Sequence, residues 1–230
     1  MNRKKIKQTL IAHSKMTKFV RDIYNYLPFN NRIRIKANNH KKICGFMKNT
    51  KINICGTNNQ LVVGNMSRLS NCRVTIKGNN NKVIIGDDCF ITEGDFFIED
   101  DNGTICIGSD TTICGYTHMA VIEGEKISIG DNCLFSANIT IRTGDSHSII
   151  ACDSQKRINI SKNVSIKDNV WIGNQVTILK GVEVSEHSVI GTGTLLTKTF
   201  LESNVILAGN PAKIIKRNID WKGERVNNFE

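Results

Sequence analysis

Apolar side chains recur at every sixth position between Arg157 and Lys198. The residues at these positions are Ile160, Ile166, Ile172, Ile178, Val184, Ile190 and Leu196. Four positions after each of the first six stands a small, polar or β-branched residue: Val164, Val170, Val176, Val182, Ser188 and Thr194. This period fits neither the turn of a helix nor the alternation of a free strand. It predicts a solenoid in which each six-residue unit forms one short side and three sides close a triangular coil.

The same kind of coil is expected from about residue 52, in a looser form. It is marked by apolar–glycine pairs 22 residues apart: Val63-Gly64, Ile85-Gly86, Ile107-Gly108 and Ile129-Gly130. The four residues beyond three six-residue sides fall in segments 57–60, 79–82, 101–104 and 123–126. Because these segments are rich in Asn, Asp and Gly, which adopt positive φ angles, we expect one extended corner in each coil.

The spacing breaks once, in the middle of the chain. Ile129 and Ile160 are 31 residues apart, thirteen more than an 18-residue coil. We therefore expect a loop to leave the coil near residues 143–156, with the sequence TGDSHSIIACDSQK. This loop contains His147.

The two ends of the chain are expected to differ from the solenoid. The predicted organisation is a basic helical arm over residues 1–42, a β-helix over 43–207 and a tail over 208–230. Apolar residues three and four apart predict a helix that Pro28 ends and that caps the first coil. The alternative is an amphipathic helix on a membrane surface. The tail leaves the solenoid at Ala208-Gly209-Asn210-Pro211 and is expected to form a short helix over the final coil.

The net charge of +10 is unevenly distributed. Residues 1–42 carry twelve Lys or Arg and one acid, whereas the other 188 residues carry nineteen basic and twenty acidic side chains. The body is therefore nearly neutral, and the arm is able to attract an anionic membrane or another polyanion. No apolar run is long enough to cross a membrane, and no signal peptide is recognisable. We expect a cytoplasmic protein, at most peripheral at the inner face of the membrane, with no nucleic-acid partner.

The eight cysteines include no C-x-x-C pair. Cys89 and Cys133 share a repeat position with Ser67 and Thr111. At such a position Cys acts as a small inward-facing apolar residue. We expect free thiols and a reducing compartment.

Several of these features together resemble the left-handed β-helix acyltransferases, and most of all the sugar and polysaccharide O-acetyltransferases. They are the hexapeptide run, the loop with His147, the segment Val170-Trp171-Ile172-Gly173 and the ending Ala208-Gly209-Asn210-Pro211-Ala212-Lys213. The resemblance covers about residues 52–218. The left-handed coil follows from the resemblance alone, since ordinary crossover connections are right-handed.

The resemblance implies a homotrimer that binds acetyl-CoA between neighbouring prisms, takes a carbohydrate acceptor and needs no metal. His147 would be the general base that removes the proton of the acceptor hydroxyl as it attacks the thioester. An imidazole has a suitable pKa for this step and contributes about 10²–10⁴-fold. Asp145 would orient the ring, with a backbone carbonyl as the alternative.

The resemblance also implies the residues that contact acetyl-CoA and the acceptor. Trp171 would point outward, because Ile172 is in the inward register, and would contact either substrate or a neighbouring chain. The other candidates for coenzyme A are Gly173, Lys180, Thr192, Lys198 and Lys213. The candidates for the acceptor are Arg142 and Arg157, which flank the loop. His118 is interpreted as structural and His187 as solvated.

The predicted function is acetyl-CoA-dependent O-acetylation of a sugar hydroxyl in a capsular or other acidic surface polysaccharide, or in its precursor. The alternatives are N-acetylation of a nucleotide-linked amino sugar and a non-catalytic scaffold. A zinc site like that of the γ-class carbonic anhydrases is disfavoured, because His118, His147 and His187 include no closely spaced pair.

Overall fold

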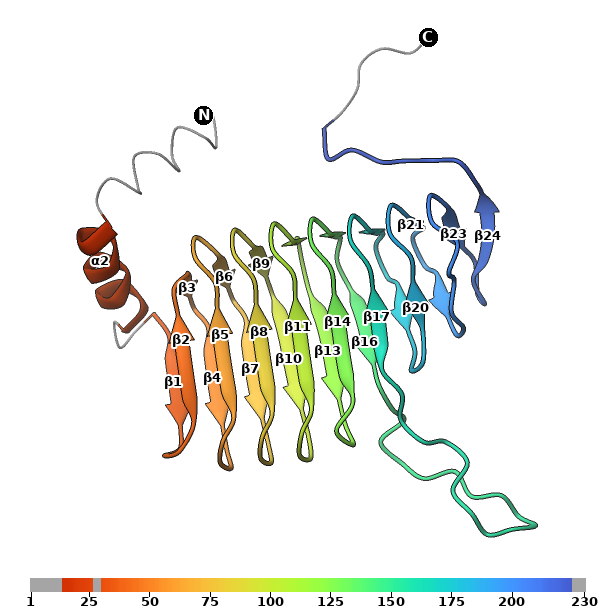
Figure 1. The fold of residues 1–230 in the computed structure, drawn as a ribbon, viewed down its shortest axis with the longest axis horizontal. Helices are drawn as coiled ribbons and strands as arrows, with labels where there is room; N and C mark the ends of the chain where they lie inside the picture. The colour runs from red at the N-terminus through yellow and green to blue at the C-terminus, as the bar shows by residue number, and fades with distance from the viewer. Residues whose placement is uncertain (1–13, 27–29, 225–230) are drawn as a thin grey trace.

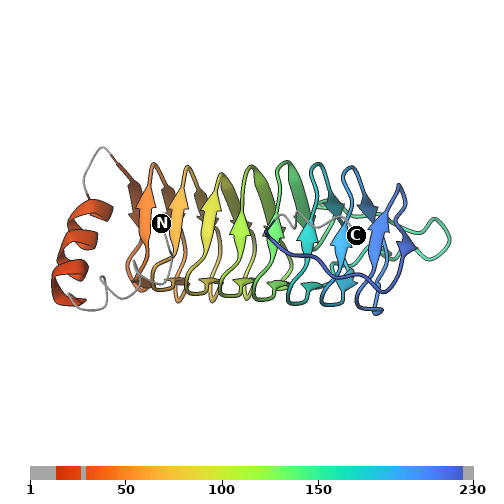
Figure 2. The ribbon, with the colours of Figure 1, turned by 90° about the horizontal axis from the view of Figure 1, so that it is seen from above.

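The predicted parallel β-solenoid is confirmed by a computed structural model, which describes residues 14–26 and 30–224 (Figure 1). Each coil before the last supplies one short strand to each of three sheets, here called A, B and C in the order in which the chain visits them. The coils are stacked in series along the prism (Figure 2). Within the described residues, helix α2 spans Ser14–Tyr26 and lies at one end of the stack.

Up to β22 the strands of each sheet follow one another at intervals of three along the chain, and sheet C then continues from β21 to β23 and β24. Sheet A contains β1 (Arg32–Ile35), β4 (Lys51–Ile54), β7 (Arg73–Ile76), β10 (Gly94–Ile98), β13 (Thr117–Val121), β16 (Ile139–Arg142), β19 (Thr177–Ile178) and β22 (Leu195–Leu196). Sheet B contains β2 (His40–Ile43), β5 (Gln60–Val63), β8 (Lys82–Ile85), β11 (Thr104–Ile107), β14 (Lys126–Ile129), β17 (Val164–Ile166) and β20 (Glu183–Val184). Sheet C contains β3 (Phe46–Lys48), β6 (Arg68–Ser70), β9 (Phe90–Thr92), β12 (Thr112–Ile113), β15 (Leu134–Phe135), β18 (Trp171–Ile172), β21 (Val189–Ile190), β23 (Ile206–Ala208) and β24 (Lys213–Lys216).

The coil-to-coil register agrees with the two periods predicted from the sequence. Ile85 pairs with Ile107, and Ile107 pairs with Ile129, so these coils repeat after 22 residues. Trp171 pairs with Val189, so the later coils repeat after 18. The inward residues form one continuous column in which most side chains are fully buried. Burial of this apolar column stabilises the prism.

The extra residues of the 22-residue coils lie at the edge between sheets A and B, as expected. Asn58 and Asn80 adopt φ angles of 55° and 58° there. The next residue of each corner is a fully buried asparagine, and the side-chain Oδ1 of Asn59 accepts a 2.9 Å hydrogen bond from the backbone N–H of Asn81. Each of these buried side-chain amides binds the backbone of a neighbouring coil, so the amides themselves are not left unpaired.

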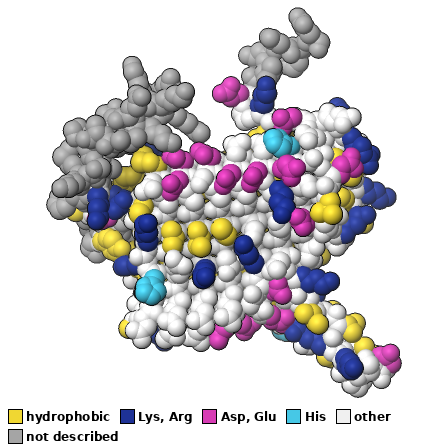
Figure 3. Space-filling model, viewed as in Figure 1, with side chains coloured by type: hydrophobic (Ala, Val, Ile, Leu, Met, Phe, Trp, Pro, Cys, Tyr) yellow, Lys and Arg dark blue, Asp and Glu magenta, His cyan; other side chains and the backbone are white. Residues whose placement is uncertain are grey.

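The edge between sheets B and C carries a row of acidic side chains, seen along the top of the prism in Figure 3. The Asp87 carboxylate accepts a hydrogen bond from the Asn65 backbone N–H at 2.6 Å, and the Asp168 carboxylate accepts one from Asp131 at 2.8 Å. These carboxylates therefore bind the backbone of the preceding coil.

The structure corrects the position of Ile160. Ile129 pairs with Ile166, 37 residues later rather than 31, and Ile160 is 63% exposed. The excursion is accordingly six residues longer than predicted, and it extends past residue 156. It rejoins the coil where the Lys162 backbone N–H donates to the Thr143 carbonyl oxygen at 2.8 Å. Ile160 matches the six-residue period by coincidence, because it belongs to the excursion.

The structure also corrects the boundary of the arm at residue 42. The first coil begins at Arg32, so Arg32, Arg34 and Lys36 and the residues of β2 belong to the solenoid. Arg32 pairs with Lys51, only 19 residues away, so this coil does not follow the 22-residue spacing. Its inward residues, such as Ile33, are only partly buried, which weakens the signal further.

Helix α2 confirms the predicted cap. The buried Asn25 side chain donates to the Gly45 carbonyl oxygen at 2.9 Å and accepts from the Met47 N–H at 2.8 Å. These bonds pair backbone groups at the open edge of sheet C, which would otherwise stay exposed. Pro28 and the residues before Ser14 lie outside the described residues, and the expected membrane contact of the arm falls largely on them.

The predicted C-terminal helix is wrong for the described part of the tail. Strand β24 instead pairs antiparallel with β23. The reason is that β23 is the last parallel strand of sheet C and has a free edge, which β24 occupies. The chain then runs back along the prism (Figure 1).

The eight cysteines are free, as expected. Burial raises the pKa of the Cys89 thiol to about 11 and that of Cys133 to about 12, so both remain neutral at physiological pH. Within the described residues, no helix is long and apolar enough to cross a membrane.

A comparison of two isoleucines tests the corrected register. We expect Ile166→Ala, which empties a fully packed position, to lower the free energy of unfolding by about 2–5 kcal/mol. Ile160→Ala, at an exposed position, should change it by less than about 0.5 kcal/mol. Denaturant unfolding of both variants measures the difference, and a larger loss at Ile160 would contradict the register.

Candidate functional site

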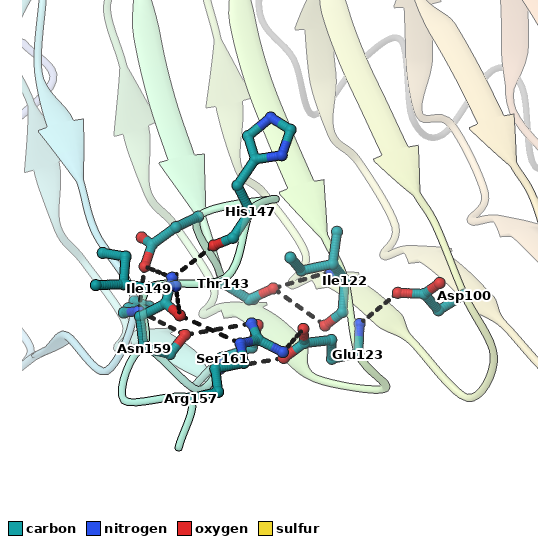
Figure 4. Close-up of polar contacts among 11 residues, drawn as sticks. Asp100, Ile122, Glu123, Thr143, His147, Ile149, Arg157, Asn159 and Ser161 are labelled. Carbon is teal, nitrogen blue, oxygen red and sulfur yellow. Dashed lines mark hydrogen bonds and ion pairs between the residues drawn. The ribbon is translucent and has the colours of Figure 1, made fainter. Parts of the chain in front are cut away.

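The excursion between β16 and β17 is a narrow hairpin. Ile150 and Arg157 form an antiparallel bridge, and the Ile158 N–H donates to the Ile149 carbonyl oxygen at 2.9 Å. Figure 4 shows the base of this hairpin against the corner of the preceding coil. The excursion is therefore ordered by its own backbone pairing.

Asn159 ties the two legs of the hairpin together. Its amide nitrogen donates to the His147 carbonyl oxygen at 2.7 Å and to Asp145 at 2.8 Å. Its amide oxygen accepts from the Ile149 N–H at 2.8 Å and from Arg157 at 3.2 Å. Because Asn159 is 7% exposed, these bonds are largely shielded from water.

Two ion pairs fasten the hairpin to the prism. Arg157 contacts Glu123 at 2.5 Å, at the corner of the preceding coil. Lys180, from the following coil, contacts the Asp145 carboxylate and donates to the Asn159 carbonyl oxygen at 3.0 Å. These hydrogen bonds hold the pKa values of the Glu123 and Asp145 carboxyls below their usual values. Both carboxylates therefore stay ionised at neutral pH.

These contacts differ from the roles expected for three candidates. The Asp145 carboxylate binds Lys180 and Asn159, and no hydrogen bond joins it to the His147 ring in the described chain. Lys180 holds the hairpin, so its charge is already paired, which disfavours the expected phosphate contact. Arg157 is likewise engaged by Glu123 and is a loop anchor in this structure.

His147 has a fixed backbone and an exposed ring. The Asn159 amide holds its carbonyl group, whereas its side chain is exposed to solvent. Figure 4 shows the ring directed away from the polar cluster around Asn159 and Arg157. The hairpin thus holds the backbone of His147 in a defined position and leaves its imidazole ring exposed to solvent. Arg142, at the start of the excursion, donates to the Ser146 hydroxyl at 3.0 Å.

Trp171 points outward from sheet C, as predicted, while Ile172 is fully buried. Trp171 as a residue is 39% exposed, and its ring lies beside Trp221 of the tail, with the ring centroids 6.1 Å apart. Trp221 is held in turn, because its indole N–H donates to the Asn169 carbonyl oxygen at 2.7 Å. The tail therefore contributes to the surroundings of Trp171.

The prism places His147 and Trp171 on opposite sides of one chain. The hairpin leaves at the edge between sheets A and B, and Trp171 belongs to sheet C, the face opposite that edge. In Figure 1 the hairpin projects below the prism, whereas the labelled sheet C strands run along the top. The two residues cannot share one site within a single prism.

The other candidates for coenzyme A occupy several places. Gly173 is buried, and a Cβ there would lie 2.8 Å from the Thr192 nitrogen. This glycine is thus required by the stacking of the coils. Thr192 is exposed at the edge between sheets C and A, Lys198 is exposed near Phe200, and Lys213 is exposed on β24.

Two residues with structural importance near these candidates were missed from the sequence. Asn159 lies between two exposed isoleucines, and only its polar character within an apolar run marks it. Trp221 lies beyond the repeat, where no period predicts its neighbours. In the described residues, no group of His, Cys, Asp and Glu side chains is arranged to hold a metal ion.

Comparison with known proteins agrees with this geometry. The family model "Bacterial transferase hexapeptide (six repeats)" matches residues 163–198. A solved polysialic acid-specific acetyltransferase, NeuO, shares 33% identity, with a TM-score of 0.80 over 88% of this chain and 92% of that chain. The solved polysialic acid O-acetyltransferase OatWY is also 33% identical, with a TM-score of 0.72 over 86% and 90%. The chain belongs to the hexapeptide-repeat acyltransferases. The left-handed β-helix expected from the resemblance is thereby confirmed.

Curated relatives in this family match over a shorter region. The polysialic acid O-acetyltransferase of Escherichia coli O1:K1 is 38% identical over 110 residues, which are 48% of this chain and 36% of that protein. The galactoside O-acetyltransferase of Lactococcus lactis is 33% identical over 110 residues, 48% and 52% of the two proteins. The matched region thus spans about a third to a half of these two relatives.

The anchoring of the hairpin by Asn159 can be tested by proteolysis. Asn159→Ala removes four hydrogen bonds, so local opening should expose the Lys156 and Arg157 backbone to trypsin. We expect cleavage there to accelerate about tenfold or more. Ser154→Ala, at the exposed tip, should cut at the wild-type rate. Equal rates for the two variants would show that Asn159 does not hold the hairpin.

Proposed function

We propose that this protein transfers an acetyl group from acetyl-CoA to a sugar hydroxyl of a polysaccharide or its precursor. The observation that carries this proposal is the anchored hairpin, which presents the exposed His147 ring from a fixed backbone. The solved polysialic acid O-acetyltransferases, similar over nearly the whole chain, support a polymeric, acidic acceptor.

His147 acts as the general base in the proposed reaction. Its ring takes the proton of the acceptor hydroxyl while the oxygen attacks the thioester carbonyl. A carbon–oxygen bond forms, the carbon–sulfur bond breaks, and the proton held by the imidazolium passes to the leaving thiolate. The products are the acetyl ester and free coenzyme A. An imidazole is well suited to both transfers, because this group in general exchanges a proton near neutral pH.

The residues of sheet C fit an extended thioester donor. Leu134, Trp171 and Val189 stand side by side on the outward face and form an apolar wall suited to a pantetheine arm. Lys198 and Lys213 are exposed cations at the same end of the prism and are suited to bind phosphates. When bound, the donor supplies the activated acetyl group.

We further propose that the site lies between chains. A site that uses both the hairpin and Trp171 must take the hairpin from one prism and sheet C from another, because one prism separates them. A contact between two different surfaces of the same chain closes into a ring when the rotation permits. A homotrimer satisfies this requirement, with three equivalent sites.

The assignment of His147 is tested by an acetyl-transfer assay. We expect wild-type protein to release thiol from acetyl-CoA with polysialic acid as acceptor, and His147→Ala to lower the rate by about 10²–10⁴-fold. His40→Ala, at another exposed histidine, is the matched control and should keep the wild-type rate. The product should lose its acetyl group in mild alkali, as an ester does and an amide does not.

Two outcomes of this assay would overturn the proposal. One is full activity in His147→Ala. The other is no thiol release with any member of a panel of sugars and polysaccharides.

A further inference from the structure

A second feature, a groove of about 410 Å³, lies along the edge between sheets C and A, near the capped end of the prism. Its lining includes Lys51, Arg73, Glu93, Asp95 and Tyr116. None of these residues belongs to the hairpin or to the sheet C wall. The groove lies on coils that precede the excursion, so it is separate from the proposed transfer site.

Cations are stacked beside this groove on successive coils. Arg32 pairs with Lys51, and Lys51 with Arg73, across three neighbouring strands of sheet A. All three side chains are exposed, and among the described residues none of them forms an ion pair. Like charges directly opposite one another destabilise a sheet. Asp95, which is in register with Arg73, offsets part of this repulsion at one end of the column, and an anion bound beside Arg32, Lys51 and Arg73 would offset the rest.

The next coil in the same column supplies a positioned carboxylate. Asp95 pairs with Arg73 in register, and its carboxylate lies 3.3 Å from His118 Nδ1 and 3.5 Å from the Tyr116 hydroxyl. The contact with His118 keeps the pKa of Asp95 below its usual value, so the group is ionised. A carboxylate in this state accepts hydrogen bonds from hydroxyl groups.

The groove is suited to binding and not to covalent chemistry. The groove is also lined by Cys72, whose thiol is buried. Burial raises the pKa of that thiol to about 11, so it is a poor nucleophile. Tyr116, by contrast, is 45% exposed and offers a flat apolar ring beside charged donors and acceptors. Cations, a fixed carboxylate and an exposed aromatic ring together match a ligand with hydroxyl groups, an apolar face and an acidic group.

We propose that this groove binds a carboxylated sugar unit of the acceptor polymer, several coils away from the unit that is acetylated. Lys51 and Arg73 hold the sugar carboxylate, Asp95 accepts from its hydroxyls, and Tyr116 packs on its ring. The column repeats at about the 4.8 Å spacing of stacked strands, so successive units of one polymer can follow the prism. The proposal rests on the proposed function for the identity of the polymer.

The test measures polymer binding without acetyl-CoA, so that it does not depend on transfer. Polysialic acid is the carboxylated probe, and dextran of similar length is the neutral one. We expect wild-type protein to bind polysialic acid and not dextran, and the double variant Lys51→Gln/Arg73→Gln to bind it about tenfold or more weakly. Tyr116→Ala should also bind more weakly.

The matched control removes the same charge elsewhere. Lys82→Gln/Lys126→Gln changes two exposed lysines of sheet B and should alter the dissociation constant by less than about twofold. Thermal unfolding of each variant shows whether the fold is retained.

Three results would overturn the proposal that the groove binds the polymer. They are no binding of polysialic acid by the wild type, binding of dextran as tight as that of polysialic acid, and a control variant weakened as much as Lys51→Gln/Arg73→Gln. Binding that is lost in Lys51→Gln/Arg73→Gln, in a protein that transfers no acetyl group, would support the groove and refute the proposed function. If the protein transfers acetyl groups but Lys51→Gln/Arg73→Gln binds the polymer as tightly as the wild type, the proposed function would be supported and the groove refuted.

Discussion

The inward side chains of a coil are buried only when each strand of that coil is in register with the strand of the preceding coil. The backbone of one layer must satisfy the hydrogen bonds of the next, and the inward side chains must stack on one another. Extra residues are therefore tolerated only at an edge. The four-residue corners, as at Asn58 and Asn80, and the long hairpin all lie at the same edge, between sheets A and B.

The hairpin shows what this constraint permits. Because the coils on either side are rigid, Glu123 before it and Lys180 after it offer fixed charged groups to which the hairpin is bound. Asn159 then holds the backbone of His147. The catalytic role proposed for His147 thus depends on groups from three successive coils. The same rigidity places Trp171 on the opposite face, and this separation is the basis for the proposed site between chains.

The repeat made most of the fold predictable. The inward isoleucines and valines recur at a fixed spacing in the sequence, and the corners are rich in asparagine and glycine. Prediction failed where this pattern is weak or matches by accident. Ile160 fits the period but belongs to the excursion, and the coil at Arg32 has a different length. Strand β24 formed in place of a helix, because the free edge of β23 decided the conformation of the tail.

The candidate site was predictable only as a set of residues. Their partners were not, because contacts such as Asp145 with Lys180 join residues 35 positions apart and no local pattern records them. The groove beside Lys51 and Arg73 was missed for the same reason, since its residues become neighbours only when 22-residue coils are stacked.

The central claim, a transfer site shared between chains, is tested most directly by mixing two inactive variants. Chains with His147→Ala and chains with Trp171→Ala, carrying different affinity tags, are co-expressed, and assemblies that contain both are purified. Every mixed trimer contains one interface at which the hairpin comes from a Trp171→Ala chain and sheet C comes from a His147→Ala chain, so about one interface in three is intact. The account predicts that the mixed assemblies regain up to about a third of wild-type activity, whereas each variant alone stays inactive. Mixed assemblies no more active than their parents would contradict it.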